Sequence, residues 1–320
     1  MIVRWGLDEL PGLLRELGIE RPFLIASDRW SSLDLPAAGR WNEVPTDRID
    51  DIASAARSSD GALAVGGGSA IDLAKAVSAA TDLRLVSVPT TYSGAEWTTF
   101  FGVRDPRKRM VGGGAGAHLA GVLYEPKLTL DLPRAVSGGT AMNALAHCAE
   151  ALYVQGRNAE GDEHALEGAR LIGESLPLVL ADGSDLEART TLLTGAMHAG
   201  AALGAAGLAL GHAMAQAVGG RYGIPHGAAN ALCLPPALRF NEPVAGAEIA
   251  RFGQALGTDD APARFEELSR LAGYERLRDL GVPEDELDEV AEATAVRAGA
   301  QANPRPASPG EIAELFRSIW

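Results

Sequence analysis

The chain has 320 residues, enough for one large domain or for two of ordinary size. Its 28 basic and 42 acidic residues give a net charge of -14, and no basic stripe offsets it, which argues against nucleic acid and anionic membranes as partners. The longest apolar runs, near residues 199–210, are short and interrupted by glycine, so the sequence predicts no membrane-spanning helix.

Up to about residue 133, helical and β-rich patterns alternate along the chain. The predicted helices and strands, in chain order, are helix 8–17, strand 22–26, helix 46–57, strand 62–65, helix 70–80 and strand 85–88. Residues 31–42 have an irregular pattern and are predicted to form a loop. Alternation of this kind is typical of a parallel sheet with helices on its faces.

From residue 137 onward, long stretches with helical periodicity are separated by short turns rich in Gly, Pro or Asp. Examples of these predicted helices are 141–153, 185–202, 208–218, 245–256 and 309–319, and no convincing strand follows residue 130. The sequence therefore predicts an α/β N-terminal domain over residues 1–136 and an all-α C-terminal domain over residues 137–320.

The first residues, MIVRWGLDELP, lack a basic segment followed by an apolar run, so we expect no signal peptide. The two cysteines, Cys148 and Cys233, both lie in apolar, helix-like stretches. Two buried thiols in a reducing compartment explain them better than a disulfide, and we expect a cytoplasmic protein.

The segment Gly66-Gly67-Gly68-Ser69 lies between a predicted strand and a predicted helix. Glycines let a phosphate approach the backbone, and a helix start offers free N–H groups to an anion. The context of strand, glycine turn and helix favours a nucleotide or phosphate site. The spacing is not the GxGxxG of an ordinary dinucleotide-binding unit, and a tight turn without a ligand remains the alternative.

The segment VPTTYSGAE, residues 88–96, begins where another predicted strand ends. Ligands of open α/β sheets bind beyond the carboxyl ends of the strands. The hydroxyl groups of Thr90, Thr91 and Ser93 are therefore candidates to contact a phosphate, a ribose or a carboxamide, although such residues are also common in turns.

A set of histidines forms the third motif. Asn143 and His147 are four residues apart on one predicted helix, and His212 and Gln216 are four apart on another, so each pair shares a helix face. His226 follows in the loop IPHG before the next helix. Imidazoles presented by two helices and a loop could converge on one metal ion. Separate structural histidines are the alternative, and we adopt it for His118, His164 and His198.

Several motifs occur in the order seen in iron-containing (group III) alcohol dehydrogenases: GGGSAIDLAKA, VPTTYSGAE, TAMNALAHCAEALY, GHAMAQAVGGRYGIPHGAANALCLP and NPRP. The resemblance covers nearly the whole chain and is closest to the maleylacetate reductase branch. Three details favour this branch: a short VPTTYSGAE loop, Asn143 where metal-binding members carry aspartate, and the NPRP motif at residues 303–306.

The resemblance implies a nicotinamide enzyme with the dehydroquinate-synthase-like fold and an active site in a cleft between its domains. It implies NAD(H), or alternatively NADP(H), held by Asp28, Gly66, Gly67, Gly68, Ser69, Asp72, Thr90, Thr91, Ser93 and Lys108. It implies a catalytic set of His147, His212, His226, Asn143 and Gln216. Among these, His147, His212 and His226 would be ligands of a weakly bound Fe, Zn or Mn ion, with Asn143 as a weak fourth ligand. A homodimer acting on a small molecule is also implied.

Two departures from the family pattern leave the reaction open. Asn143 is a neutral amide in place of a carboxylate, and Gln216 replaces a histidine and cannot transfer a proton near pH 7. Our leading interpretation is an NAD(P)H-dependent reductase of a small anionic oxo or enol acid. The carboxylates of this substrate would pair with basic side chains, for which the candidates are Lys108, Arg109, Arg221 and Arg305. The alternatives are a non-redox lyase or cyclase like dehydroquinate synthase, a family member with altered chemistry, and a non-catalytic protein that holds a nucleotide.

Overall fold

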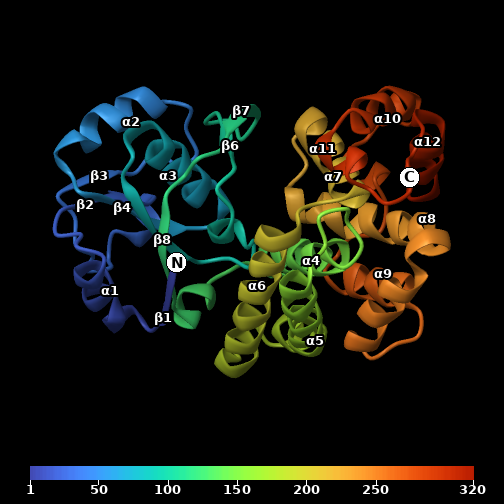
Figure 1. The fold of residues 1–320 in the computed structure, drawn as a ribbon, viewed down its shortest axis with the longest axis horizontal. Coiled ribbons are helices and arrows are strands. Elements are labelled where there is room, and N and C mark those ends of the chain that lie inside the picture. Colours follow the sequence, from blue (N-terminus) through green and yellow to red (C-terminus); the bar gives the residue numbers. More distant parts are fainter. The chain divides into compact units, whose positions relative to one another are not determined.

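The computed structural model describes residues 1–320 and divides them into two compact units (Figure 1). The α/β unit comprises Met1–Thr91 and Ala95–Thr129, and the helical unit comprises Tyr92–Gly94 and Leu130–Trp320. The boundary that the sequence suggests, between 136 and 137, falls inside helix α4 (Arg134–Ala151), which stays whole in the structure. The three residues Tyr92–Gly94 belong to the helical unit although the chain on both sides of them belongs to the α/β unit.

A six-stranded parallel sheet forms the centre of the α/β unit, with the strand order β1-β8-β5-β4-β2-β3. Its strands are β1 (Ile2–Trp5), β2 (Pro22–Ile25), β3 (Gly39–Trp41), β4 (Gly61–Gly66), β5 (Arg84–Pro89) and β8 (Leu119–Tyr124). Strands β2 and β4 are buried throughout, which agrees with their continuous apolar sequence. The predicted parallel α/β fold is confirmed.

Helices cover both faces of this sheet. They are α1 (Leu10–Glu16), α2 (Ile49–Ala55) and α3 (Gly68–Thr81). Leu63 and Val65 pack with α1 on one face, whereas Ala62 and Ala64 pack with α2 and α3 on the other. Successive residues of β4 therefore serve two separate cores, because side chains alternate across a strand.

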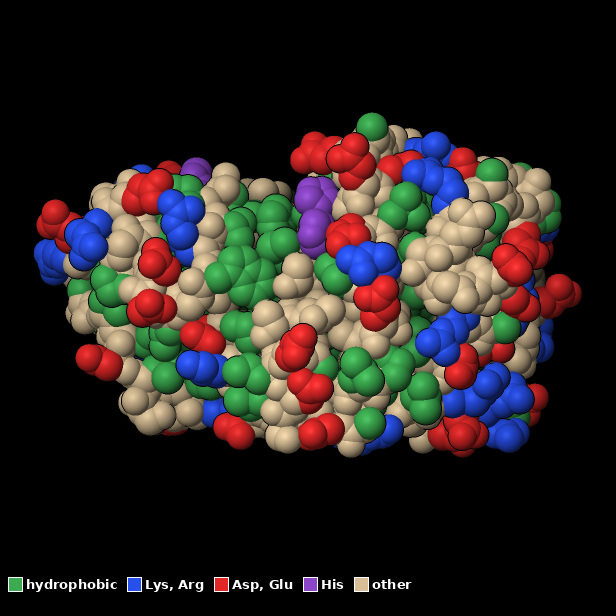
Figure 2. All heavy atoms as spheres, turned by 90° about the horizontal axis from the view of Figure 1, so that it is seen from below, with side chains coloured by type: hydrophobic (Ala, Val, Ile, Leu, Met, Phe, Trp, Pro, Cys, Tyr) green, Lys and Arg blue, Asp and Glu red, His purple; other side chains and the backbone are tan.

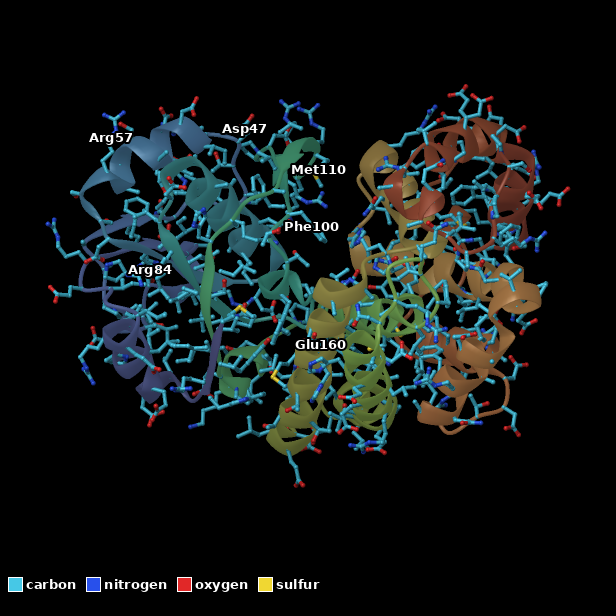
Figure 3. The ribbon with its side chains drawn as sticks, in the orientation of Figure 1. Asp47, Arg57, Arg84, Phe100, Met110 and Glu160 are labelled. Atoms are coloured by element: carbon cyan, nitrogen blue, oxygen red, sulfur yellow. The ribbon has the colours of Figure 1, made fainter.

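The sequence did not indicate β1, β3, β8 or the antiparallel hairpin of β6 (Phe101–Arg104) and β7 (Met110–Gly114). The loop predicted over 31–42 is wrong at Gly39–Trp41, which pairs with β2 as the edge strand β3. Strand β7 is fully exposed and rich in glycine, so it carries neither an apolar run nor an alternation. Phe100 and Met110, beside and within this hairpin, are 46% and 44% exposed (Figure 3).

The second unit consists of helices, and no strand follows residue 130, as predicted. Its helices are α4, α5 (Ala159–Ala181), α6 (Leu186–Ala206), α7 (Leu210–Tyr222), α8 (His226–Ala255), α9 (Ala261–Leu271), α10 (Leu287–Ala295), α11 (Ala298–Gln301) and α12 (Pro309–Ser318). Helix α8 joins the helix expected after the IPHG loop to the one expected over 245–256, and its helical conformation is interrupted at Ala245. One apolar core joins α7, α8, α10 and α12.

Cys148 and Cys233 are free and buried, as predicted, and burial raises the pKa of both thiols. No single helix is long and apolar enough to cross a membrane, although α6 and α7, bent by 103° relative to each other, reach that length and composition together. On the face shown in Figure 2, acidic and basic side chains are interspersed.

Candidate active site

The glycine turn joins β4 to α3, as the sequence predicts. Gly66 has a φ of 153°, a conformation that favours glycine, and Gly67 is the N-cap of α3, whose start no side chain caps. The backbone N–H of Thr90 donates to the Gly66 carbonyl at 3.0 Å. A Cβ on Gly67 would lie 2.8 Å from Thr91 Cγ2. The ends of β4 and β5 therefore place Thr90 and Thr91 against an uncapped helix start, an arrangement that suits an anion.

Three further residues expected at the cofactor lie at different places in the α/β unit. Asp28 follows β2 in a short 3₁₀ turn and is exposed, and Asn42 Nδ2 donates to its Oδ1 at 2.8 Å. Asp72 pairs with the buried Lys75 at 2.8 Å and accepts the Gly102 N–H, so it also fastens β6 to α3. Lys108 lies in the turn between β6 and β7 with a positive φ of 64° and an exposed side chain.

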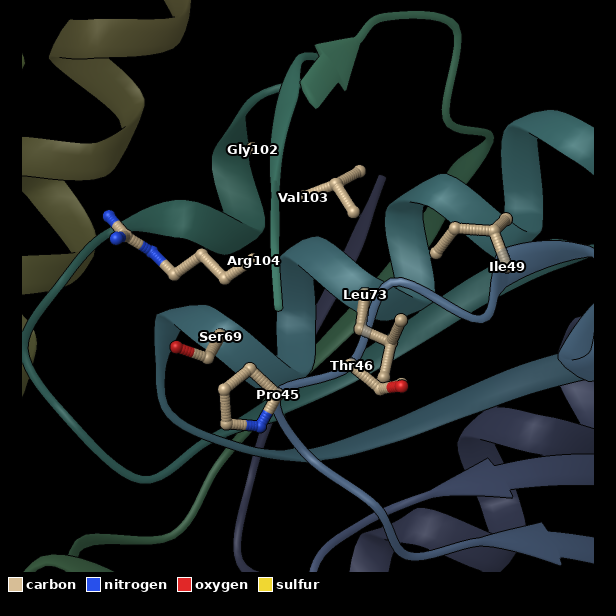
Figure 4. A pocket seen from close by; sticks show the side chains of 8 residues that line it. All are labelled: Pro45, Thr46, Ile49, Ser69, Leu73, Gly102, Val103 and Arg104. Carbon is tan, nitrogen blue, oxygen red and sulfur yellow. The ribbon is translucent and has the colours of Figure 1, made fainter. Parts of the chain in front are cut away.

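A pocket lies beside the start of α3 (Figure 4). Its lining combines apolar side chains with a few polar ones from the segment before α2, from the first residue of α2, from α3 and from β6: Pro45, Thr46, Ile49, Ser69, Leu73, Gly102, Val103 and Arg104. Ser69 belongs to the glycine motif, so the pocket adjoins that motif. Thr46 and Arg104 were not expected from the sequence, because the segments that carry them show no motif.

The segment Tyr92–Gly94 is fixed within the helical unit. Tyr92 is fully buried, its N–H donates to Thr140 Oγ1 at 3.3 Å, and its hydroxyl accepts from Arg189 at 3.0 Å. Arg189 is itself only 1% exposed and also donates to the carbonyls of Gly183 and Leu130. This buried guanidinium thus holds the residue that precedes Ser93, and no sequence motif indicated this contact.

The three expected histidines converge in the helical unit. His147 on α4 and His212 on α7 are stacked with ring centroids 4.8 Å apart, and the rings of His212 and His226 are 5.7 Å apart. The first two side chains are 3% and 0% exposed. His226 is the first residue of α8 rather than part of a loop, so three helices supply the cluster. Only Ile224 and Pro225 of the IPHG segment precede that helix.

Asn143 connects this cluster to the Tyr92–Gly94 segment. Its amide nitrogen lies 3.1 Å from the Ser93 carbonyl oxygen and 3.3 Å from His147 Nε2, while its amide oxygen accepts from Asn230 Nδ2 at 2.7 Å. The Ser93 carbonyl oxygen can only accept a hydrogen bond, so the atom of the Asn143 amide that faces it must be the nitrogen. Asn230, which was not expected from the sequence, lies four residues after His226 on α8 and so shares its face.

Two buried ring nitrogens in the cluster have no hydrogen-bond partner: His147 Nδ1 and His212 Nε2. Burial, followed by the neighbouring His212 and His226, lowers the pKa of His147 well below its ordinary value. His147 is therefore neutral at pH 7. Because the Asn143 amide donates to its Nε2, the ring proton of His147 lies on the unpartnered Nδ1.

As placed, these side chains do not fit the metal ion that the resemblance implies. No group of three His, Cys, Asp or Glu side chains in the chain is arranged to hold a metal. The expected fourth ligand, Asn143, presents its amide nitrogen to His147, and its oxygen is bonded to Asn230. An amide nitrogen is a hydrogen-bond donor without a lone pair for an ion.

A buried carboxylate, Glu150, also belongs to the site and was missed from the sequence. It is fully buried and accepts three N–H groups: those of Ala209 at 2.7 Å and His212 at 3.1 Å from the backbone, and that of the His212 ring at 2.8 Å. Glu150 lies three residues after His147 on α4. Its position on the same helix face was the one available signal.

The remaining candidates lie elsewhere or are already paired. Gln216 is half-buried one turn after His212 on α7. Arg221 pairs with Glu286 and Glu289 on the surface, Arg305 pairs with Glu311 and stacks on Phe240, and Arg109 pairs with Asp105. His118 lies 3.4 Å from Asp82, and His164 and His198 contact each other at 2.8 Å. These contacts give the last three histidines the structural partners expected of them.

Comparison with known proteins gives matches along both units. A family model described as the Fe-containing alcohol dehydrogenase family, C-terminal, matches residues 138–320, and one described as iron-containing alcohol dehydrogenase matches residues 4–115. Maleylacetate reductase of Sphingobium indicum is 38% identical over 276 residues, covering 85% of this chain and 78% of that protein. Maleylacetate reductase 2 of Cupriavidus pinatubonensis is 35% identical, with 98% and 92% covered. The crystal structure of maleylacetate reductase from Agrobacterium tumefaciens superposes with a TM-score of 0.90 at 30% identity, covering 100% of this chain and 95% of that one.

Proposed function

Because the chain belongs to the iron-containing alcohol dehydrogenase family and is an NAD(P)-dependent oxidoreductase, we propose that it uses NADH to reduce a small anionic oxo or enol acid, with maleylacetate as the first candidate. The observation that carries the chemical part of this proposal is the buried histidine cluster, in which His147 Nδ1 and His212 Nε2 have no partner in the protein. Buried polar atoms are rarely left unpaired, and a substrate oxygen is a suitable partner for them. The substrate class rests on the maleylacetate reductases among the relatives.

The nicotinamide, when bound, supplies the hydride. Addition of hydride to an activated carbon places negative charge on the substrate oxygen or on an enolate, and this charge must be met by preorganised donors. The Nδ1–H of His147 is such a donor, since the amide of Asn143 and the stack with His212 hold its ring in place. His226 contributes a further imidazole to the cluster, and an imidazole is a side chain able to deliver a proton.

The α/β unit supplies the cofactor site in this proposal. The uncapped start of α3 at Gly67 and Gly68 would hold the pyrophosphate, and Thr90 and Thr91 would contribute hydroxyl groups beside it. The pocket next to Ser69 combines apolar and polar side chains beside this helix start. Asp28 would accept hydrogen bonds from the ribose hydroxyls.

We expect wild-type enzyme to use NADH with at least about tenfold higher kcat/KM than NADPH, because a 2′-phosphate would face the Asp28 carboxylate. Asn42 orients that carboxylate by its hydrogen bond of 2.8 Å. Steady-state kinetics with both cofactors measures the ratio. The Asp28→Ser variant, which lacks the carboxylate charge, should have a smaller ratio of kcat/KM with NADH to kcat/KM with NADPH. Equal or better use of NADPH by the wild type would contradict the placement of Asp28 at the ribose.

Metal binding by the wild type should be weak, and Asn143→Asp should raise the affinity for Zn²⁺ or Mn²⁺ by at least about tenfold. The substitution replaces an amide nitrogen that faces His147 with a carboxylate oxygen. Calorimetric titration of chelator-treated protein measures the change, and the added affinity should disappear when His147→Ala is combined with it. A wild-type protein that retains one ion against a chelator would show that the neutral amide of Asn143 does not weaken metal binding.

The reaction itself is tested by mixing the purified enzyme with NADH and maleylacetate and following the absorbance of the reduced nicotinamide. Consumption of NADH in step with loss of the oxo acid supports the proposal. If no oxo acid oxidises NADH although NADH binds, the non-redox lyase or cyclase becomes the better interpretation.

A cytoplasmic homodimer without nucleic-acid or membrane partners is also part of this proposal and rests on the family and on the net charge of -14. Light scattering of the purified protein tests the dimer.

A further inference from the structure

Glu150 occupies an unusual position, at the start of a helix to which it does not belong. Helix α7 begins at Leu210, and its N-cap Ala209 has no side chain that can accept a hydrogen bond. Glu150, from α4, instead accepts the N–H groups of Ala209 and His212. A carboxylate at this end of a helix also interacts favourably with the helix dipole. A buried carboxylate from another helix therefore takes the place of the N-cap side chain that usually accepts these hydrogen bonds.

The third N–H that Glu150 accepts gives this arrangement a chemical consequence. Its Oε2 lies 2.8 Å from His212 Nδ1, and both of its oxygens already face backbone donors. The carboxylate therefore has only acceptor sites to offer, so His212 Nδ1 must carry a proton to face it. The Nε2 atom is buried and faces no acceptor that could take a second ring proton, so the arrangement leaves it with a lone pair.

We propose that Glu150 is a positioning residue that holds His212 as the Nδ1–H tautomer, so that His212 presents a lone pair while the stacked His147 presents an N–H. The two rings then have opposite roles: His147 donates a hydrogen bond, and His212 accepts one. A donor and an acceptor together suit a group with a hydroxyl, such as an enol or the alcohol product. The role in turnover rests on the proposed reductase function, whereas the tautomer does not depend on it.

The tautomer is tested first on the wild-type protein, without any substitution. Protein labelled with ¹⁵N-histidine is measured by long-range ¹H–¹⁵N NMR at pH 7.5, and His212→Gln identifies the signals by their loss. The expected result for His212 is a protonated Nδ1 and a bare Nε2. An Nε2–H tautomer, or a ring protonated on both nitrogens, would overturn the proposal whatever the enzyme turns out to reduce.

The effect on turnover is tested with Glu150→Gln, which keeps the size of the side chain but offers one acceptor oxygen to three donors. We expect kcat to fall about 10–100-fold, as for other residues that orient a functional histidine, while KM for NADH stays unchanged. The His212 spectrum should show loss of the single Nδ1–H form. Asp260→Asn is the matched control, because Asp260 caps α9 through the Ala263 N–H without contacting a histidine. It should leave kcat and the spectrum unchanged.

A purely structural role for Glu150 predicts a different result. The Glu150→Gln variant would then unfold more easily but would keep both the Nδ1–H tautomer and the wild-type kcat when folded, which would refute the proposal. If the variant does not fold, the wild-type spectrum still decides the tautomer. If only the proposed reductase function is wrong, the NMR spectrum of wild-type His212 still shows the Nδ1–H tautomer. Failure of the proposed function can therefore be distinguished from failure of the tautomer proposal.

Discussion

His226→Ala is expected to lower turnover by about 10²–10⁴-fold, the usual cost of losing a positioned acid or base, while NADH binding stays near that of the wild type. The ring of His226 lies 5.7 Å from that of His212, within the cluster on the helical unit. The glycine motif and Asp28, which would hold the cofactor, belong to the other unit. The substitution should therefore separate catalysis from cofactor binding.

The structure also answers the simplest alternative for His226, which is that it caps the helix after IPHG. The N-cap of α8 is Pro225, no side chain makes a capping hydrogen bond there, and His226 is already helical. Alanine is a good helix former at this position, so the variant should keep its stability. His118→Ala is the control, because His118 lies in the α/β unit beside Asp82.

Three measurements are made on both variants. Stopped-flow kinetics gives turnover, fluorescence titration gives the affinity for NADH, and thermal unfolding gives the stability. Normal turnover by a folded His226→Ala protein would remove this histidine from the mechanism. A parallel loss of NADH affinity would instead mean that the cluster contributes to the cofactor site.

Gly227→Ala is expected to reduce the free energy of unfolding by about 3 kcal/mol or more, at the upper end of overpacking substitutions. A Cβ on Gly227 would lie 2.1 Å from the carbonyl oxygen of Gly139 and 2.9 Å from its Cα. All of these atoms belong to the backbone of α4, so no side-chain rotation relieves the clash. Helices α4 and α8 must move apart, or the start of α8 must unwind.

Activity should fall together with stability in Gly227→Ala. Helix α4 carries Asn143 and His147, and α8 carries His226 and Asn230, so their close approach places the four side chains. Separation of the helices would lengthen the hydrogen bond of 2.7 Å between the two asparagines. A shift of about 1 Å at a catalytic group is enough to cost about 10²-fold in rate.

Gly220→Ala on α7 is the matched control for this substitution. A Cβ on Gly220 meets nothing within 4 Å, so the variant should gain about 0.5–1 kcal/mol from the higher helix propensity of alanine. Urea unfolding followed by circular dichroism measures both variants. If Gly227→Ala is as stable as the wild type, the two helices do not pack as closely as the structure shows.

Local sequence patterns determined the features that depend on neighbours along the chain. The glycine turn between β4 and α3 was predictable because the strand, the turn and the helix are contiguous. The pairing of Asn143 with His147 on one helix face followed from helical periodicity alone. The motif order also indicated the family, because the motifs are retained in sequence even where single residues differ.

The chemistry of the site depended on contacts between residues far apart in the chain. Only the folded structure shows that Glu150 from α4 caps α7 and binds His212, or that the amide nitrogen of Asn143 faces His147 because Ser93 and Asn230 fix it. No local pattern encodes these contacts, since each depends on which helices pack together. The same holds for the exposed strand β7, whose partner is set by hydrogen bonds to β6 rather than by its own residues. Hydrogen-bond partners and side-chain orientation are decided by the requirement that buried polar groups be satisfied, and this requirement acts only once the chain has folded.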